Sequence, residues 1–313
     1  MILSVSRRTD IPCYYSDWFL NRIKEGWLYV RNPMNPRQVS KIDISSEIVD
    51  CIVFWTKNPE PMLDRLEELK DYTYYFQFTL TPYGQDIERY VPHKKERMIP
   101  VFRELSEMIG VERVIWRYDP ILFNEVYTEE YHKRAFAQMA EALSGYTKKC
   151  VISFVDIYAK NRKAMEALHF TEKSEAELRD FAGFLCETAG EYGIEVVACG
   201  EKLDLSGLGI KRSSCIDREL IERMIGSRIK IGKDSGQRPE CGCIESIEVG
   251  TYDTCLNGCK YCYANVSRQR AEQNYRGYDA KAPFLCGELQ PEDKVTVRKV
   301  KSLKENQLDI WNL

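Results

Sequence analysis

Short apolar segments alternate with amphipathic segments along most of the chain. Seven of the apolar segments are rich in aromatic and β-branched residues, a composition typical of strands. They span residues 2–6, 51–56, 75–80, 113–118, 151–157, 194–199 and 244–249. Because helical segments separate them, these strands predict a parallel sheet wound with crossover helices.

Helices are predicted where apolar residues recur every three to four positions and the ends carry capping residues. The predicted helices span residues 16–25, 59–70, 128–143, 174–191, 217–225 and 265–274. Ser16 is expected to cap the first, and Gly26 to end it. A further helix over residues 97–109 is expected to be broken or kinked at Pro100.

The fold class that follows is α/β, a partial or closed (β/α) barrel. Seven candidate strands without a glycine-rich dinucleotide turn favour a barrel, while an open doubly wound sheet stays possible. We expect residues 1–206 to form the main part of the barrel, and residues 207–243 a basic connection. Residues 244–286 would complete the barrel with a strand, a loop and a helix. Residues 287–313 would be a peripheral polar tail docked by Ile310, Trp311 and Leu313.

Composition and charge exclude several classes of protein. The 313 residues are 44% hydrophobic and 30% charged, which excludes a disordered chain or a disulfide-stapled miniprotein. The net charge of −3 gives no sign of a nucleic-acid or membrane partner. No apolar run reaches the ~18 residues of a membrane helix, and no signal peptide is seen at the N-terminus. The chain is expected to be cytoplasmic.

The twelve cysteines are unevenly distributed, and five of them fall between residues 241 and 262. In a reducing cytoplasm they would be thiols, metal ligands or redox groups rather than structural disulfides. Four others stand singly in apolar segments, where a cysteine behaves as a small hydrophobe. For these four, Cys51, Cys150, Cys186 and Cys199, we expect core packing.

Polar side chains gather where the predicted strands end. The first six strands are followed in turn by Arg7, Arg8 and Asp10; Lys57 and Asn58; Thr79 and Thr81; Arg117 and Asp119; Asp156; and Glu201. In a parallel barrel these ends share one mouth, where active sites lie. Each residue alone could instead cap a helix, pair with another of these residues or face solvent. Together they predict a catalytic site with Arg7, Lys57, Arg117, Asp119, Asp156 and Glu201.

The sharpest chemical signal is the loop with Cys255, Cys259 and Cys262. Soft thiolates select iron–sulfur clusters, zinc or copper(I) over harder cations. Because cubane clusters usually take four cysteines, a loop that supplies three leaves one iron open to a substrate or cofactor. Tyr261 and Tyr263 would shield one face of this site from water.

The loop, C-x3-C-x-Tyr-C-Tyr-Ala, resembles the cluster loop of radical S-adenosylmethionine (AdoMet) enzymes. The whole chain also resembles an uncharacterised bacterial family, a domain of unknown function with a radical-SAM-like C-terminal cysteine cluster. This second resemblance is carried by Ser6–Asp10 (SRRTD), Trp55–Pro59 (WTKNP), Arg117–Pro120 (RYDP) and the cysteines from Cys241 to Cys262.

The resemblance implies a [4Fe–4S] cluster on the three cysteines, with AdoMet on the fourth iron. It also implies an electron donor such as a flavodoxin or ferredoxin, and hydrogen abstraction from an unknown substrate by a 5′-deoxyadenosyl radical. Arg7, Lys57 and Arg117 would bind anionic groups, and Asp119, Asp156 and Glu201 amine or hydroxyl groups. In that superfamily the loop follows the first strand, whereas here it follows the last. If the first and last strands are neighbours, the loop reaches the same mouth.

Two other functions stay open. No glycine-glycine-acidic segment follows the second strand, so the chain could be an iron–sulfur electron carrier or redox sensor without AdoMet. The basic segment at 207–238 and the many tyrosines allow a zinc module associated with nucleic acid. Cys241 and Cys243, with Cys215, could hold a second cluster or a zinc ion. They could also provide a fourth ligand to the first cluster, or be free thiols. Cys286 is expected to be packed.

Overall fold

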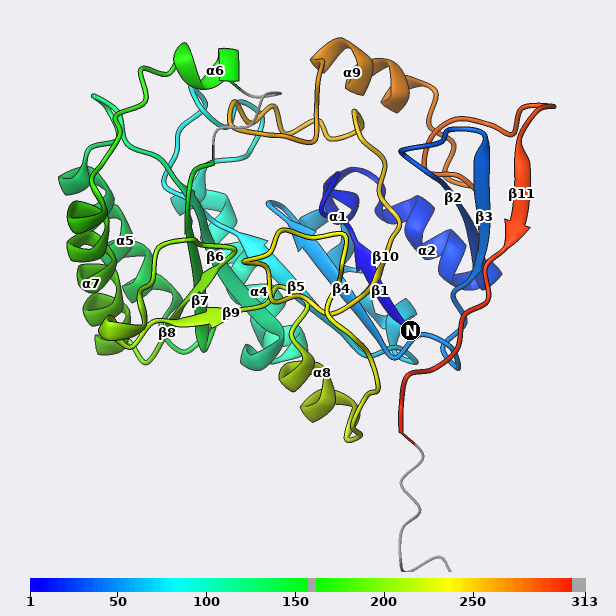
Figure 1. Ribbon diagram of the computed structural model, residues 1–313, viewed down its shortest axis with the longest axis horizontal. Helices are drawn as coiled ribbons and strands as arrows, with labels where there is room; N and C mark the ends of the chain where they lie inside the picture. Colours follow the sequence, from blue (N-terminus) through cyan, green and yellow to red (C-terminus); the bar gives the residue numbers. More distant parts are fainter. Residues whose placement is uncertain (157–161, 306–313) are drawn as a thin grey trace, which may run out of the picture.

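Eight parallel strands form the central sheet, and a separate sheet of three strands lies beside it (Figure 1). The computed structural model describes residues 1–156 and 162–305. The central strands are β1 (Ile2–Val5), β4 (Cys51–Thr56), β5 (Tyr74–Thr79), β6 (Val114–Ile121), β7 (Lys149–Phe154), β8 (Glu195–Cys199), β9 (Lys211–Ser213) and β10 (Ile247–Glu248). Their order across the sheet is β10-β1-β4-β5-β6-β7-β8-β9.

Helices connect most neighbouring strands. They are α1 (Ile11–Tyr14), α2 (Ser16–Glu25), α3 (Glu60–Leu63), η1 (Leu66–Leu69), η2 (Lys94–Met98), α4 (Ile99–Ile109), η3 (Val111–Arg113), α5 (Glu129–Leu143), α6 (Arg162–Glu166), α7 (Glu175–Glu191), η4 (Ser206–Leu208), α8 (Arg218–Ile225) and α9 (Arg268–Arg276). Helices α5 and α7 lie together on one side of the molecule (Figure 1).

The caps expected from the sequence hold several of these helices. The side chains of Thr128, Ser174 and Asp217 each accept a backbone N–H at the start of α5, α7 and α8. Gly26 ends α2 with a φ of +74°, a conformation that glycine adopts without strain. Local sequence therefore fixes where these helices begin and end.

Some elements differ from the prediction. The helix expected over residues 59–70 is two short pieces, α3 and η1. Pro100 does not break its helix, because it lies in the first turn of α4, where proline needs no N–H partner. The π-helical turn η2 precedes it. The seventh strand is only two residues long, and of the fifth predicted strand Ile157 lies outside the described residues.

The first and last strands of the predicted set are neighbours. Strand β10 pairs in parallel with β1, and Leu3 lies opposite Ile247. The outermost strands are β9 and β10, and no pairing joins them within residues 1–156 and 162–305. The fold is thus α/β with an eight-stranded parallel sheet. The additional strand β9 was not expected, because its three residues, KRS, carry no apolar pattern.

Both faces of the central sheet are buried, as the apolar strands predict. One face packs against α4, α5 and α7 in the largest core cluster, which includes Phe76, Trp116 and Phe136. The opposite face, here called the inner face, carries a second cluster. Its strand residues come mostly from the first half of each strand: Ile2, Cys51, Val53, Tyr75, Ile115, Val151 and Val197.

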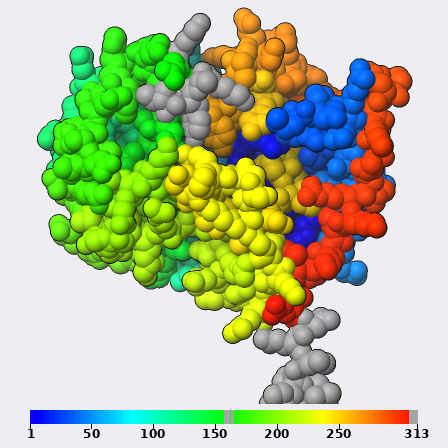
Figure 2. Space-filling view, viewed as in Figure 1, coloured from blue at the N-terminus to red at the C-terminus, as the bar shows by residue number. Residues whose placement is uncertain are grey.

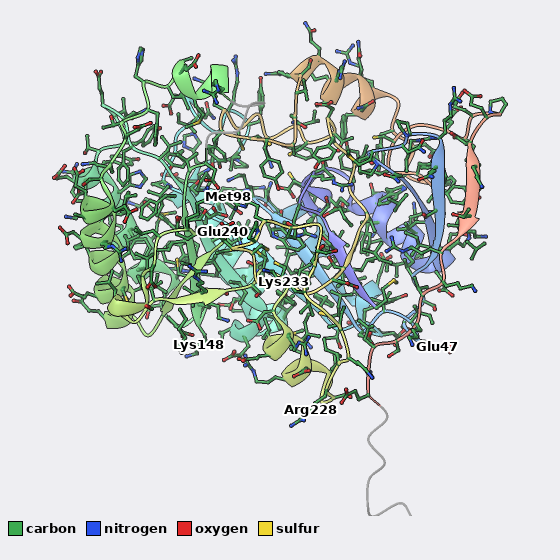
Figure 3. All side chains as sticks on the ribbon, viewed as in Figure 1. Glu47, Met98, Lys148, Arg228, Lys233 and Glu240 are labelled. Carbon is green, nitrogen blue, oxygen red and sulfur yellow. The ribbon has the colours of Figure 1, made fainter. Side chains whose placement is uncertain are left out.

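The segment 207–243 covers this inner face. Leu220 and Ile221 of α8 pack with Ile216 and Ile229 onto the second cluster. Figure 2 shows the chain near residues 230–245 over the front of the molecule, and Figure 3 marks Arg228 at its lower end. The segment was expected to be a basic connection. Its charged residues are mostly exposed, but most of its apolar residues belong to the core.

The separate sheet, also not predicted, joins distant parts of the chain. Its strands are β2 (Trp27–Arg31), β3 (Gln38–Asp43) and β11 (Lys294–Val297), in the order β11-β3-β2. Strand β11 attaches the C-terminal tail to β3 by parallel pairing. The expected docking residues Ile310, Trp311 and Leu313 lie outside the described residues. None of the helices in the described ranges has the length and apolarity needed to cross a membrane.

Candidate functional site

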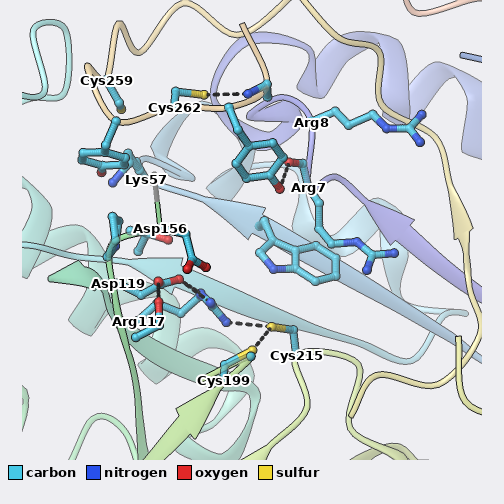
Figure 4. Close-up of a pocket in the computed structure, with 18 of the residues that line it drawn as sticks. Arg7, Arg8, Lys57, Arg117, Asp119, Asp156, Cys199, Cys215, Cys259 and Cys262 are labelled. Carbon is cyan, nitrogen blue, oxygen red and sulfur yellow. Dashed lines mark hydrogen bonds and ion pairs between the residues drawn. The ribbon is translucent and has the colours of Figure 1, made fainter. Parts of the chain in front are cut away.

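A pocket of about 320 Å³ opens at the carboxyl ends of the central strands. It is lined by thirteen of the predicted site residues: Arg7, Lys57, Arg117, Asp119, Asp156, Cys215, Cys241, Cys243, Cys255, Cys259, Cys262, Tyr261 and Tyr263. Glu201 does not line it. Figure 4 shows Cys259 and Cys262 on one wall and Cys199 and Cys215 on the opposite wall.

Strand periodicity explains why the pocket is polar. Successive inward side chains of a strand lie two residues apart. On β6, apolar Ile115 is followed on the same face by Arg117 and Asp119. On β7, Val151 is followed by Ser153. The inner face is therefore apolar where the 207–243 segment covers it and polar further along, where the pocket lies.

Arg117 and Asp119 form an ion pair at the floor of the pocket. The Arg117 guanidinium also donates to Gln77 Oε1 at 3.2 Å and to Cys215 Sγ at 2.9 Å. Asp119 accepts a hydrogen bond from the Ser153 hydroxyl. Although burial opposes the charged form, the Cys215, Asp119 and Cys199 side chains raise the pKa of Arg117 well above its ordinary value.

Arg7 lies beside β10. Its guanidinium is 3.5 Å from a Glu248 carboxylate oxygen and 3.6 Å from Asp234, and it lies 5.7 Å from the centre of the Trp55 ring. Its charge is thus offset by two carboxylates.

Lys57 belongs to a buried network centred on Glu88. Glu88 accepts from Lys57 Nζ at 2.7 Å, from Thr81 Oγ1 at 2.7 Å, and from Lys94 and Tyr261. Burial alone would raise the pKa of Glu88, but the charges and hydrogen bonds of the two lysines lower it to about 2. Glu88 is therefore ionised and fixes Lys57 and Tyr261 beside the cysteine loop.

The three cations expected to bind anionic groups are thus each paired with a carboxylate. Arg8 differs from them. Its guanidinium donates to the Gly250 carbonyl at 3.3 Å and lies 4.8 Å from the centre of the Tyr252 ring. In the described part of the chain, no carboxylate lies within ion-pair distance of Arg8, which also lines the pocket.

The cysteine loop is held against the strand ends by a buried carboxylate. Asp10 accepts from Thr56 Oγ1 and the Lys57 backbone N–H, both at 2.7 Å, and from Asn257 Nδ2 at 3.0 Å. The Tyr14 hydroxyl donates to the Oδ1 atom of the same Asn257 side chain at 2.9 Å. One carboxylate therefore joins the ends of β1 and β4 to the loop.

A glycine fits the loop closely onto the 84–90 segment. Gly258 has a φ of +66°, and a Cβ there would lie 2.9 Å from the Tyr90 ring. A larger residue would be strained in both respects.

The loop thiols Cys255, Cys259 and Cys262 are partly buried and close enough to influence one another's ionisation. Burial raises the pKa of Cys255 to about 12 and raises the pKa values of Cys259 and Cys262 as well. The Ala264 N–H points at Cys262 Sγ at 3.3 Å. At neutral pH these thiols are protonated until a cation binds, because a metal ligand must be a thiolate.

The remaining predicted residues have structural partners. Asp156 forms an ion pair with Arg238 at the pocket rim. Glu201 accepts backbone N–H groups from Phe154 at 3.1 Å and Lys202 at 2.9 Å, and so holds the chain after β8. Tyr263 donates to the Arg7 carbonyl at 3.1 Å. Glu201 is the one predicted residue that the structure leaves outside the pocket.

Comparison with known proteins gives the family. The profile described as "Domain of unknown function (DUF1848)" matches residues 2–264. The chain belongs to this family. No curated protein and no solved structure matches the chain. The matched region of the DUF1848 protein contains all eight strands of the central sheet and all the pocket cysteines.

Sequence reasoning missed three contributors to the site of the DUF1848 protein. Glu88 and Asn257 lie in polar loops, where nothing in the local sequence distinguishes them from solvated residues. Cys199 is packed in the second core cluster, as expected, but it also lines the pocket, and its Sγ lies 3.0 Å from that of Cys215. Its position at the end of β8, where other strands carry polar residues, was the available signal.

Proposed function

We propose that the DUF1848 protein is a radical AdoMet-type enzyme whose cluster is held by Cys255, Cys259 and Cys262. The observation that carries the proposal is that these thiols share one pocket with the polar ends of the parallel strands. Because β10 pairs in parallel with β1, the loop after the last strand lies at the same end of the sheet as the end of the first strand, which supports the resemblance.

The donor set suits an iron–sulfur cluster with an open iron. Three soft sulfur ligands come from a single loop, and the Ala264 N–H is directed at one of them, as hydrogen bonds to cluster sulfurs commonly are. Within residues 1–156 and 162–305, no three potential ligands already surround a common point. The thiols would therefore turn toward the cluster as it binds, each losing its proton.

When bound, the cluster and AdoMet would supply a 5′-deoxyadenosyl radical. Cofactors carry such chemistry, and the protein supplies orientation and exclusion of water. Tyr263 and Trp55 provide flat apolar surfaces in the pocket for this purpose. Glu88 holds Lys57 and Tyr261 in place beneath the loop.

The substrate would lie between the loop and the floor of the pocket. Asp119 and Ser153 line the floor, where Asp119 also pairs with Arg117, and Asp156 lies at the rim in its ion pair with Arg238. Since Arg7, Lys57 and Arg117 already have carboxylate partners, an anionic group of substrate or AdoMet would be bound best by Arg8.

Electron paramagnetic resonance of the anoxically purified, dithionite-reduced protein tests the proposal. We expect a reduced [4Fe–4S] signal that changes when AdoMet is added, and slow release of 5′-deoxyadenosine. A signal that ignores AdoMet would contradict the enzyme function and favour an electron carrier or redox sensor. Iron that cannot be reconstituted at all would exclude both.

Two cysteine variants make the test specific to the loop. Cys259→Ala should abolish the AdoMet-sensitive signal and the release of 5′-deoxyadenosine. Cys13 is the matched control, because it lies near Cys255 but does not line the pocket. Cys13→Ala should keep both properties. If Cys13→Ala instead removed the signal, Cys13 would be a fourth ligand, and the cluster would have no open iron.

A further inference from the structure

A second group of sulfur atoms lies across the pocket from the loop. Cys199 at the end of β8, Cys215, Cys241 and Cys243 are all buried and all line the pocket. We call these four residues the thiol quartet. They come from three separate parts of the chain.

Two members of the thiol quartet are in direct contact. The Sγ atoms of Cys199 and Cys215 are 3.0 Å apart, and this contact is drawn in Figure 4. The pKa values of Cys241 and Cys243 are shifted by each other's side chains and by Cys215, so these thiols lie near the contacting pair. The four sulfur atoms therefore share one region of the pocket wall.

All four quartet cysteines belong to the second core cluster, but polar groups also contact some of their sulfur atoms. Arg117 donates to Cys215 Sγ at 2.9 Å, and the Ile216 N–H points at Cys243 Sγ at 3.4 Å. The Arg7 guanidinium is near enough to Cys243 and Cys215 to interact with their charges. By contrast, Cys51 on the inner face makes only a 3.6 Å contact with its neighbour's carbonyl. Donors and cations around sulfur stabilise thiolate, the form that binds metal.

We propose that the thiol quartet binds one tetrahedral zinc ion. Four sulfurs at the usual zinc–sulfur distance of about 2.3 Å stand about 3.8 Å from one another. The 3.0 Å contact between Cys199 and Cys215 would open by roughly 0.8 Å to reach this spacing, a movement within the range of side-chain rotation. A cubane spreads its four cysteines over four iron atoms, so the close contacts favour a single ion.

Two cations lie beside the quartet. Four thiolates and one Zn²⁺ carry a net charge of −2, and Arg117 donates directly to one of the four sulfur atoms. Because Arg117 also pairs with Asp119, and Arg7 with Glu248 and Asp234, the two guanidinium groups would offset only part of this charge. Within residues 1–156 and 162–305, no three potential ligands already surround one centre, so the quartet thiols would turn toward the ion as it binds.

The zinc ion would fasten the 207–243 segment to the sheet. Cys199 belongs to β8, whereas Cys215, Cys241 and Cys243 lie at the two ends of the segment that covers the inner face. The inference does not rest on the proposed AdoMet chemistry, since the quartet and the loop are separate ligand sets.

Metal analysis of purified protein tests the quartet separately from the loop. The variant with Cys255→Ala, Cys259→Ala and Cys262→Ala should lose its iron and keep about one zinc per chain. The variant with Cys241→Ser and Cys243→Ser should lose zinc and keep the iron of the loop. Cys186→Ser, in α7 and away from the pocket, is the matched control and should keep both metals.

X-ray absorption at the zinc edge of the wild-type protein covers the case in which a quartet variant fails to fold. Four sulfur neighbours at about 2.3 Å are expected. Fewer sulfurs, or oxygen and nitrogen neighbours, would overturn the proposal. So would iron retained by the loop variant, which would mean a second cluster. A Cys199–Cys215 disulfide in metal-free protein, together with failure to take up added zinc after reduction, would overturn it as well.

Discussion

Glu88 is a buried carboxylate that holds two lysines and a tyrosine in the wall of the pocket. Its side chain is about 1% exposed, and Lys57 and Lys94 both pair with it. Removing one partner of a buried ion pair costs about 3–5 kcal/mol, because the remaining charge is left uncompensated. Glu88 therefore matters more for order around the cysteine loop than its polar sequence context suggests.

We expect Glu88→Gln to lower the free energy of unfolding at pH 7 by about 3–5 kcal/mol in urea titrations. Glu60→Gln is the matched control, since Glu60 pairs with Arg97 at the surface and its loss should cost at most about 1 kcal/mol. A Glu88→Gln protein as stable as the control would show that the two lysines reach solvent.

Glu88 also makes the free energy of unfolding depend on pH. Its pKa is lowered from 4.5 to about 2 on folding, so its contribution is complete above about pH 4.5. It is lost as the pH falls from 4.5 toward 2, because the unfolded chain then binds a proton that the folded chain does not. The stability difference between wild type and Glu88→Gln should shrink over that interval.

At the scale of elements, the short strand β10 places the cysteine loop. It has only two residues, yet it aligns the chain parallel to β1. The next residues pass close to the end of β1. An ideal Cβ at Gly250 would lie 1.8 Å from Ser6 Oγ and 2.5 Å from Ser6 Cβ. Only glycine allows this approach, which sets the start of the loop.

Gly250→Ala should therefore separate β10 from β1 and lower the free energy of unfolding by about 1–3 kcal/mol, a cost typical of overpacking. The iron content after reconstitution should fall with it, because the loop begins at this contact. Gly277→Ala serves as control. A Cβ at Gly277 has no neighbour nearer than 3.8 Å, and its φ of −89° suits alanine. If the two variants lost the same free energy of unfolding, the close approach of Gly250 to Ser6 would not be what requires glycine.

At the scale of the whole molecule, the sequence predicts features whose signals lie within a few residues and misses features that depend on contacts between distant residues. Strands such as β4, and helices with caps at Thr128, Ser174 and Asp217, carry their signals within a few residues. Polar residues at strand ends located Arg117 and Asp119 in the pocket. Strand β11 is exposed throughout and pairs with the distant β3, so no local pattern reveals it. The contacts of Cys199 with Cys215 and of Glu88 with Lys57 likewise depend on tertiary structure.

The 207–243 segment changes the view of the molecule most, because most of its apolar residues are part of the core. Ile221 of α8 is fully buried against the inner face of the sheet. Truncating such a side chain removes buried surface and leaves a cavity, which costs about 2–5 kcal/mol. Ile221→Ala should therefore lower the free energy of unfolding by that amount, and Ile221→Val by about 0.5–1.5 kcal/mol. Val297→Ala on the exposed strand β11, where the side chain is 76% exposed, should change the free energy of unfolding by no more than about 0.5 kcal/mol.

If urea titrations found that Ile221→Ala lowers the free energy of unfolding as little as Val297→Ala does, the segment would be a detachable cover. Both the floor of the pocket and the thiol quartet would then have to be held by other contacts, since Cys215, Cys241 and Cys243 all belong to this segment.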